Sequence, residues 1–282
     1  MAATTVFITG ARGKTGAALA AWLAGRRDVE VRGGTSRPSP AGAPGATLVQ
    51  FDWAQPEGWG RALAGADAVY LMRPEVANAP ERVARLVATA RPDARIVLLS
   101  EMGADRMPDG SWVAEVERAV MAGHRPWTIL RPSWFQQVLT DDRFFRADIA
   151  ERGVIAMPTG GAAFSWIDAR DIAAVAGHAL TGDGHAGAAY TLSGPAALTL
   201  AELTQRLGAV TGRVVRALDP APEEVVAGLE PWLTEVLSDV YDRGRAGRFG
   251  EVTDDVRAVT GRSARSVDAF IAEHAAAWRH AA

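Results

Sequence analysis

A chain of 282 residues, 48% of them hydrophobic and 22% charged, can bury one large core or one core with a smaller lobe. Its formal net charge of −3 gives no support for nucleic acid or an anionic membrane as a partner. The absence of cysteine excludes disulfides, thiolate catalysis and cysteine metal sites, and no apolar run approaches the roughly 20 residues needed to span a bilayer.

The first predicted element is a short buried strand over 6–9, and it leads into a glycine-rich turn. Gly10, Gly13 and Gly16 have the spacing G-x-x-G-x-x-G, and an alanine-rich helix is predicted over 17–24. Glycines let the backbone approach a pyrophosphate, and N–H groups at a helix start face the anion. The turn therefore predicts a dinucleotide site. We expect so early a strand to leave no room for a signal peptide, which makes the cytoplasm the expected location.

The same residues also match part of a second nucleotide-binding motif, the P-loop. Gly13-Lys14-Thr15 matches the last three positions of a P-loop, but the preceding glycine is Gly10, three positions before Gly13 instead of five. This spacing argues against a P-loop.

The second predicted strand, over 29–34, ends where an NAD site places a carboxylate against the ribose 2′-hydroxyl. Thr35, Ser36 and Arg37 stand there and no acid does, which favours a 2′-phosphate. Arg12, inside the glycine turn, could reach the same phosphate. The alternative is that both arginines are solvated loop charges.

The remainder of the first two-thirds alternates between strands and helices. Strands are predicted over 47–52, 68–72, 95–100, 127–131 and 189–192, and helices over 81–90, 111–122 and 172–180. This alternation predicts an α/β fold with a doubly wound parallel sheet of the Rossmann type. Ligands bind at the carboxyl ends of such strands, which places Gly10, Met72, Arg73, Ser100, Arg131 and Pro132 around one crevice. Asp52, at the end of the third strand, is predicted to lie near the adenine or to cap the next segment.

Beyond Pro132 the alternation loosens and aromatic residues gather. Trp134 and Phe135 directly follow a strand end, which favours a pocket wall over a core role, while Phe144 and Phe145 suit either. Short strands are predicted over 154–156 and 164–167, and helices over 202–210, 223–229, 231–243 and 266–278. Thr199 and Glu202 have the spacing of a capping box. The five histidines lack the spacing of metal ligands, so no metal site is predicted.

Several of these stretches together resemble the NmrA-like family of atypical short-chain dehydrogenase/reductases, in the group of NAD(P)H-binding and ergot-alkaloid-type reductases. The matching stretches are TGARGKTG at 9–16, ADAVYL at 66–71, WTILRPSWF at 127–135, IDARDIA at 167–173 and EVTDDV at 251–256. They span almost the whole chain and are specific to the family, though not to one substrate.

The resemblance implies a Rossmann-type domain, 1–132 plus 168–194, with a smaller, mostly helical substrate-binding lobe, 133–167 plus 195–282. It also implies that Gly10, Gly13 and Gly16 bind the pyrophosphate, that Arg12 and Arg37 read the 2′-phosphate and that Arg131, Pro132 and Ser133 lie beside the nicotinamide. With the residues selected from the pattern itself, the predicted cofactor is NADP(H), and its predicted contacts are Gly10, Arg12, Gly13, Lys14, Thr15, Gly16, Ser36, Arg37, Asp52, Met72, Arg73, Ser100, Arg131, Pro132 and Ser133. The expected substrate contacts are Trp112, Trp134, Phe135, Gln136 and Phe144. The chain departs from its relatives at Val138, where many have asparagine, and this puts an amide contact to the substrate in doubt.

The usual catalytic pair of short-chain dehydrogenases, Tyr-x-x-x-Lys, is missing. The chain's single lysine is Lys14, in the glycine turn, and none of its three tyrosines has lysine four residues later. The nearest candidate proton donors are Ser100 and Glu101, and both could equally be structural.

Two main functions fit this sequence. The first is NADPH-dependent reduction of a small conjugated or cationic molecule (imine or iminium, enone, quinone or azo compound) by direct hydride transfer, with plain ketones excluded. The second, which the resemblance implies, is a redox sensor that binds NAD(P) without turnover and regulates a protein partner. A non-redox cyclase has lower weight, and a homodimer is compatible with the sequence.

Overall fold

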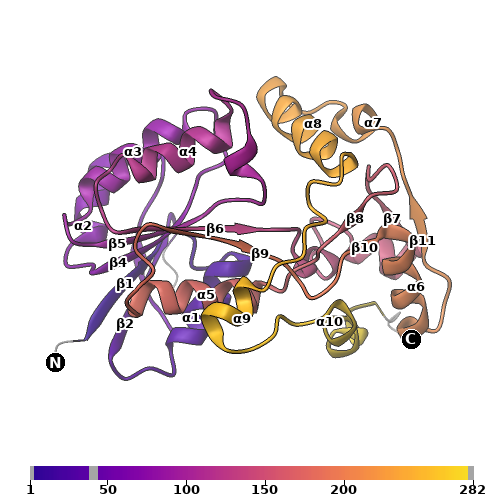
Figure 1. Cartoon of the computed structure of the whole chain (residues 1–282), viewed down its shortest axis with the longest axis horizontal. Coiled ribbons are helices and arrows are strands. Elements are labelled where there is room, and N and C mark those ends of the chain that lie inside the picture. Colours follow the sequence, from indigo (N-terminus) through magenta and orange to yellow (C-terminus); the bar gives the residue numbers. More distant parts are fainter. Residues whose placement is uncertain (1–2, 38–43, 279–282) are drawn as a thin grey trace. The chain divides into compact units, whose positions relative to one another are not determined.

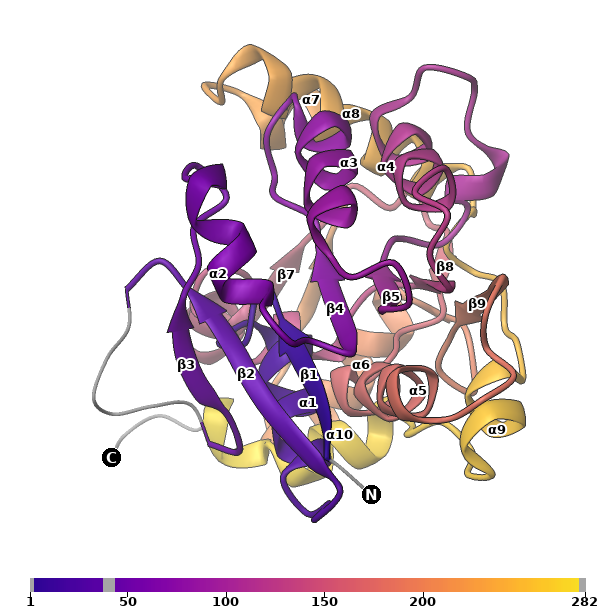
Figure 2. The same ribbon diagram turned by 90° about the vertical axis from the view of Figure 1, so that its left-hand side faces the viewer.

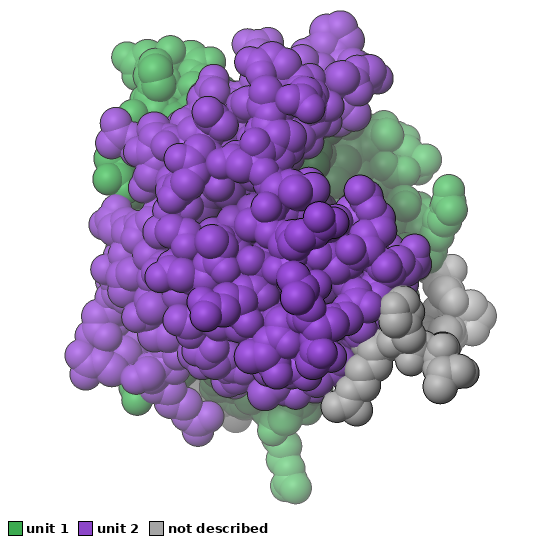
Figure 3. Space-filling view, turned by 90° about the vertical axis from the view of Figure 1, so that its right-hand side faces the viewer, with its two compact units in different colours: residues 1–132, 169–191, 258–261 green, residues 133–168, 192–257, 262–282 purple. Residues whose placement is uncertain are grey.

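The computed structural model describes residues 3–37 and 44–278, and the chain divides into two compact units. Unit 1 comprises 1–132, 169–191 and 258–261, and unit 2 comprises 133–168, 192–257 and 262–282; Figure 3 colours them green and purple. That the first binds the cofactor and the second the substrate stays a prediction. No helix in the described part of the chain is long and apolar enough to cross a membrane.

Unit 1 is built on a seven-stranded sheet in the order β3-β2-β1-β4-β5-β6-β9. The strands are β1 (Thr4–Ile8), β2 (Val29–Thr35), β3 (Thr47–Gln50), β4 (Ala68–Met72), β5 (Arg95–Leu99), β6 (Trp127–Pro132) and β9 (Ala188–Leu192). From β3 to β6 neighbouring strands pair in parallel, with Ile8 opposite Gly33 on one side and Tyr70 on the other. The chain runs from β1 outward to β3 and returns at β4, so the strand order reverses beside β1. Such a reversal is where open α/β sheets bind ligands.

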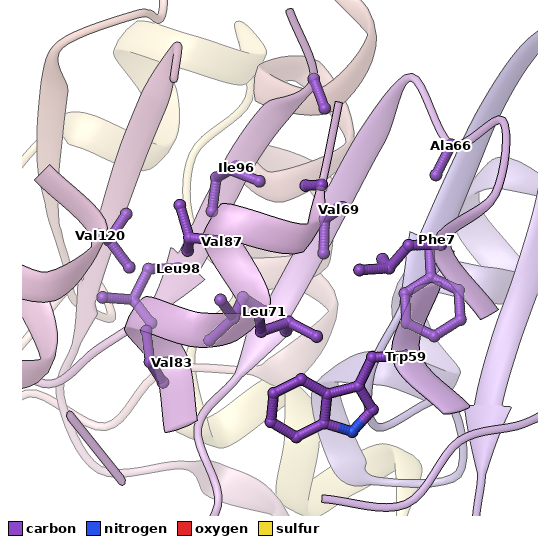
Figure 4. Close-up of a cluster of buried hydrophobic side chains, with 14 of the residues drawn as sticks. Phe7, Trp59, Ala66, Val69, Leu71, Val83, Val87, Ile96, Leu98 and Val120 are labelled. Atoms are coloured by element: carbon purple, nitrogen blue, oxygen red, sulfur yellow. The ribbon is translucent and has the colours of Figure 1, made fainter. Parts of the chain in front are cut away.

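Helices cover both faces of this sheet (Figure 1). On one face α1 (Lys14–Leu23) packs against α5 (Ala169–Thr181), and Gly177 permits the close approach, because a Cβ there would lie 2.3 Å from the Trp22 ring. The opposite face carries α2 (Trp59–Leu63), α3 (Ala79–Thr89) and α4 (Trp112–Met121), as Figure 2 shows. Under these three helices lies a buried apolar cluster that includes Phe7, Trp59, Val69, Leu71, Val83, Val87, Ile96, Leu98 and Val120 (Figure 4).

Unit 2 contains two small sheets and most of the C-terminal helices. β7 (Val154–Ala156) pairs in parallel with β11 (Arg216–Leu218), and β8 (Ala163–Phe164) pairs antiparallel with β10 (Leu198–Thr199). The helices after β10 are α6 (Leu200–Thr211), α7 (Pro222–Val226), α8 (Pro231–Arg245), α9 (Asp255–Thr260) and α10 (Val267–Glu273). Short 3-10 helices lie at Pro56–Gly58, Ala104–Arg106, Gln136–Leu139 and Ala275–Trp278, and a π-helical turn at Asp148–Arg152.

The structure confirms the predicted Rossmann-type fold, with a strand at 188–192 that joins the main sheet beside β6. It also confirms the capping box, since Glu202 N–H donates to Thr199 Oγ1 at 3.2 Å and Thr199 N–H donates to Glu202 Oε2 at 2.8 Å. Several boundaries were wrong. The helix predicted from 17 begins at Lys14, and the strands predicted over 47–52 and 164–167 end at Gln50 and Phe164. The helix predicted over 223–229 ends at Val226, and the one predicted over 266–278 ends at Glu273. After Phe164 the backbone pairs with other segments, since Ser165 N–H donates to the Phe249 carbonyl and Ile167 N–H to the Trp134 carbonyl, both at 2.8 Å. Gly228, with a φ of 80°, lies where the helix from 223 was predicted to continue.

Candidate functional site

The glycine turn joins β1 to α1 and is held against the end of β4. Met72 N–H donates to Thr9 Oγ1 at 2.8 Å, and Gly13 N–H donates to the Gly10 carbonyl at 2.9 Å. Gly13 is the N-cap of α1, no side chain caps this helix, and its first turn contains no acid. Neither its own first turn nor a side-chain cap from the described residues therefore offsets the positive end of the helix dipole.

Glycine is required here by space. A Cβ on Gly16 would lie 2.1 Å from the Gly10 carbonyl oxygen, a backbone atom that cannot move without opening the turn. On the neighbouring strand, a Cβ on Gly33 would lie 2.5 Å from the Cβ of Ala11. The two glycines let the turn close tightly against α1 and β2, which is the geometry that brings backbone N–H groups to a phosphate.

Two exposed cations, which have no side-chain partner among residues 3–37 and 44–278, follow the ends of neighbouring strands. Arg12 lies in the glycine turn after β1, and Arg37 follows β2. Both side chains are exposed, and neither makes a hydrogen bond or ion pair with any residue in 3–37 or 44–278. Arg37 N–H donates to Thr35 Oγ1 at 3.2 Å, which fixes the turn that carries Ser36. The turn at 35–37 therefore carries the positive charge of Arg37 and no carboxylate.

The structure places Asp52 in the turn that follows β3. Its Oδ1 accepts a hydrogen bond from Ala54 N–H at 2.8 Å and so stabilises the turn after β3. It also lines a hollow of about 320 Å³, together with Gln50, Phe51, Gln55, Glu57, Gly58 and Arg61. A contact with adenine stays a prediction.

At the ends of β4 and β5, three of the predicted residues lie together. Arg73 Nη2 forms an ion pair with Glu101 Oε2 at 2.8 Å, and its guanidinium lies over the Trp112 ring, 4.7 Å from the centroid. Trp112 Nε1 in turn donates to the Val76 carbonyl at 2.9 Å. These contacts tie the loops after both strands to the start of α4 and engage the Glu101 carboxylate.

A second polar cluster joins the ends of β5 and β6 and centres on Glu117, which sequence reasoning did not select. Ser100 Oγ donates to Glu117 Oε1 at 2.6 Å. Arg131 donates to both carboxylate oxygens, from Nε at 3.0 Å and from Nη2 at 2.7 Å. Glu117 is 2% exposed. An acid on the apolar stripe of a helix, between Val113 and Val120, is a signal that could have identified it.

This arrangement bears on the two predicted proton donors. A serine hydroxyl has one proton, and that of Ser100 is directed at Glu117. Glu101 is paired with Arg73. A catalytic role for either residue stays a prediction, and it requires that these bonds first be exchanged for bonds to a substrate.

In unit 2, Trp134 belongs to an aromatic cluster, which we define as Trp134, Phe164, Trp166, Tyr241 and Phe249. Its ring meets those of Phe164, Trp166 and Phe249 edge to face, with centroids 5.7, 6.2 and 6.3 Å away. It is stacked with Tyr241 at 6.5 Å and an interplanar angle of 27°. Phe164, Trp166 and Phe249 are buried, whereas Trp134 and Tyr241 are only half-buried. The sequence indicated Trp134 but not its partners Tyr241 and Phe249.

The residues beside Trp134 hold the cluster in place. Ser133 Oγ and Ser165 Oγ both donate to the Phe249 carbonyl, at 2.9 and 3.1 Å. Gln136 is fully buried, and its Nε2 donates to the carbonyls of Trp166 and Arg265. These bonds give Ser133 and Gln136 structural roles within unit 2, and their predicted ligand contacts stay predictions.

The other predicted residues of this segment differ in exposure. Phe135 is half-buried and forms a β-bridge with Ile167, whereas Phe144 is 47% exposed. Val138, at the position where many relatives have asparagine, is buried. Within the described ranges, no group of three or more His, Asp or Glu residues could hold a metal ion.

The chain is similar to known proteins that bind a nicotinamide cofactor. A family model described as NAD(P)H-binding matches residues 10–181. The chain is 34% identical over 246 residues to the NAD(P)H azoreductase of Xenophilus azovorans, covering 84% of this chain and 85% of that one. It is 32% identical over 281 residues to a (4-alkanoyl-5-oxo-2,5-dihydrofuran-3-yl)methyl phosphate reductase of Streptomyces griseus, covering 97% and 99%. A quinone oxidoreductase of Escherichia coli, solved with NADPH, has the same fold, with a TM-score of 0.80 at 22% identity over 96% of this chain and 99% of that one.

Proposed function

We propose that this chain, which belongs to the NAD(P)H-binding family, uses NADPH to reduce a conjugated or cationic small molecule. Within that family it is one of the NmrA-like atypical reductases and an NAD(P)H-dependent oxidoreductase. The substrate class is an imine or iminium, enone, quinone or azo compound. Reduction proceeds by direct hydride transfer without a Tyr-Lys pair. The observation that carries the proposal is the closed glycine turn with two exposed arginines beside it, neither of which is paired with another described residue.

The residues of unit 1 fit a nicotinamide dinucleotide. The pyrophosphate is bound by the backbone of Gly10, Gly13 and Gly16 at the uncapped start of α1. Its approach depends on the absence of a side chain at Gly16, where a Cβ would meet the Gly10 carbonyl oxygen. Lys14 and Thr15 belong to the same first turn. When bound, the reduced cofactor supplies a hydride.

The preference for NADPH follows from charge. The side chains of Arg12 and Arg37 are exposed and have no partner among the described residues. Each can therefore bind a 2′-phosphate without first breaking an ion pair with one of those residues. Arginine binds phosphate with two parallel hydrogen bonds. With no carboxylate at 35–37, the ribose 2′-hydroxyl of NADH would find no acid to accept its hydrogen bond.

The substrate is assigned to unit 2. Its aromatic cluster leaves Trp134 and Tyr241 partly accessible, and flat conjugated molecules stack on such rings. The named activities of the relatives, on an azo compound and on an unsaturated ring carrying a carbonyl group, fit a conjugated acceptor. Such acceptors take hydride readily, which suits a chain whose α4 contains neither tyrosine nor lysine.

The test is oxidation of NADPH, followed at the cofactor's absorbance, with a panel of azo dyes, quinones, enones and iminium ions. Binding of NADPH and NADH is measured in parallel on the wild type, on Arg12→Ala/Arg37→Ala and on Arg27→Ala, whose arginine is also exposed but lies at the other end of α1. We expect the double variant to lose about tenfold or more in NADPH affinity, since charge-assisted hydrogen bonds are worth about 1.5–3 kcal/mol each before screening. NADH binding and the Arg27→Ala variant should change little.

Two results would contradict the proposal. Equal losses for NADPH and NADH would refute the 2′-phosphate assignment. Tight NADPH binding without oxidation by any member of the panel would favour a redox sensor over a reductase.

A further inference from the structure

The side chain of Met72 packs against the glycine turn, and all the residues of this contact belong to unit 1. Met72 ends β4, and its N–H donates to Thr9 Oγ1 at 2.8 Å. Its thioether fills the space beside two glycines, because a Cβ on Gly10 would lie 2.7 Å from Met72 Sδ and one on Gly13 would lie 3.3 Å from Met72 Cε. Thr15 Oγ1 donates to the same sulfur at 3.7 Å. The sulfur therefore lies against two of the three glycines that we propose to bind the pyrophosphate.

Methionine supplies all the sulfur of this chain, which has six methionines and no cysteine. Of the five methionines that the structure describes, Met102 and Met157 are buried. The other three, Met72, Met107 and Met121, are half-buried. Met107 precedes α4 and Met121 ends it, whereas Met72 lies at the glycine turn. Peroxides convert a methionine thioether into a sulfoxide, which methionine sulfoxide reductases convert back.

A sulfoxide at Met72 would change both the size and the polarity of the group against the turn. The thioether already fills the space beside Gly10 and Gly13, so an added oxygen must displace either the side chain or the turn. The oxygen is also a polar hydrogen-bond acceptor. It would lie near the start of α1, whose N–H groups are the donors that a pyrophosphate needs. Oxidation therefore opposes binding of the pyrophosphate both by crowding the turn and by competing for its donors.

We propose that Met72 is an oxidation site that switches off binding of the nicotinamide cofactor; this inference rests on the proposed pyrophosphate site and not on the acceptor that is reduced. A lone pair of the sulfur attacks one oxygen of hydrogen peroxide, so that an S–O bond forms and the O–O bond breaks. The departing hydroxide takes the proton from the oxygen that the sulfur has gained. The sulfur loses two electrons to the peroxide, and the products are the sulfoxide and one water molecule. Reduction of the sulfoxide restores the thioether and with it the binding of the cofactor.

The experiment compares NADPH binding before and after treatment with hydrogen peroxide. Wild type, Met72→Leu and Met107→Leu are treated, the peroxide is removed, and the NADPH dissociation constant is measured by the change in cofactor fluorescence. The ratio of the two constants is taken for each protein, so any effect of Met72→Leu on the untreated affinity cancels. We expect this ratio to be at least about fivefold in wild type and in Met107→Leu, the lower end for an overpacked site. In Met72→Leu it should stay within about twofold.

Peptide mapping by mass spectrometry connects the loss of binding to one sulfur without any variant. Samples of wild type are taken during the treatment, and the oxidised fraction of Met72 is compared with the fraction of protein that has lost NADPH binding. The two fractions should rise together. NADPH added before the peroxide should slow the oxidation of Met72 and leave that of Met107 unchanged. Methionine sulfoxide reductases should restore binding to the treated protein.

Thermal unfolding separates a blocked turn from a damaged core. Met102 and Met157 are buried, so oxidation of either would disrupt core packing instead of acting at the turn. The unfolding curve of each treated protein is therefore recorded at the peroxide dose that oxidises Met72. We expect treated wild type to unfold cooperatively, as the untreated protein does, although it no longer binds NADPH tightly.

Loss of binding that is confined to the proteins with Met72, while their fold is kept, supports the inference. An equal ratio in Met72→Leu and wild type would overturn it, and so would retained binding in wild type whose Met72 is fully oxidised. Loss of binding in unfolded protein alone would also count against it. The two proposals fail separately: wild type that binds NADPH but reduces no acceptor refutes the reductase and not the switch, whereas wild type that binds neither NADPH nor NADH refutes both.

Discussion

Removing the carboxylate of Glu117 should be among the more damaging single changes at the carboxyl end of the sheet. The side chain is 2% exposed and accepts hydrogen bonds from Ser100 Oγ and from two nitrogens of Arg131. In Glu117→Ala the Arg131 side chain, 13% exposed, would keep, among its ion pairs with described residues, the one with Asp105 at 3.3 Å. Asp105 is 46% exposed, so solvent screening weakens its ion pair with Arg131. This pair therefore compensates only in part for the loss of Glu117.

The magnitude follows from the broken ion pair. Removing one member of a buried pair typically costs about 3–5 kcal/mol, and the partial compensation by Asp105 places the expected loss near about 3 kcal/mol. For a chain of this size that corresponds to a fall in Tm of roughly 6–12 °C. Ser100 also loses its acceptor and shares in this loss.

Urea unfolding of purified variants measures the effect, and two variants serve as controls. Glu115→Ala removes a half-buried acid from the same helix, whose side chain is 38% exposed and paired with Arg118 at 2.6 Å, and should cost about 0–1 kcal/mol. Glu117→Met with Arg131→Met replaces the whole pair by apolar side chains and should recover much of the loss. A cost for Glu117→Ala no larger than that of Glu115→Ala would refute the reasoning, because the pair would then contribute nothing measurable.

Three further predictions concern the substrate, the chemistry and acid stability. Trp134→Ala should raise the Michaelis constant for aromatic acceptors and leave the NADPH dissociation constant nearly unchanged; a protein that unfolds on this change would show that Trp134 serves the core. An unactivated aliphatic ketone should not be turned over, and Ser100→Ala should cost less than the roughly 10²–10⁴-fold of a lost general acid, so steady ketone turnover would disprove this account. Hydrogen bonds from the Thr199 backbone and side chain lower the pKa of the Glu202 carboxyl in the folded protein. Ionised Glu202 therefore stabilises the fold fully above the pKa of an unfolded glutamate, about 4.3, and this stabilisation is lost as the pH falls through the lower pKa of the folded state. Glu202→Gln should therefore lower Tm at neutral pH and flatten its fall below about pH 4, and parallel Tm–pH curves for the two proteins would contradict this.

Local patterns were enough to predict the sheet and the glycine turn. Buried parallel strands are short continuous apolar runs, as at 68–72, and the sequence predicted that strand to the residue. The spacing of Gly10, Gly13 and Gly16 between a strand and a helix needs no distant partner to be recognised. Strand β11, at 216–218, was missed because it is exposed and has neither an apolar run nor clear alternation.

The candidate site was predicted in part. The residues around the crevice at the ends of β4 and β5 were selected because parallel strands place their carboxyl ends at one edge. Glu117 was not selected, because its role depends on Ser100 and Arg131, which reach it from two other elements. Phe249 was missed for the same reason, since only folding brings it beside Trp134.

By itself the sequence determined that this chain has a Rossmann-type sheet, a dinucleotide turn, no acid after the second strand and no Tyr-Lys pair, because each is a matter of residue type and short spacing. The tertiary structure alone decided which polar groups are engaged and which remain available. Ser100 donates its proton to Glu117, while Tyr241, far from Trp134 in sequence, stacks with it. Hydrogen bonds and ring contacts of this kind act over a few ångströms, so they are set by the packing of distant segments and leave no periodic signal along the chain.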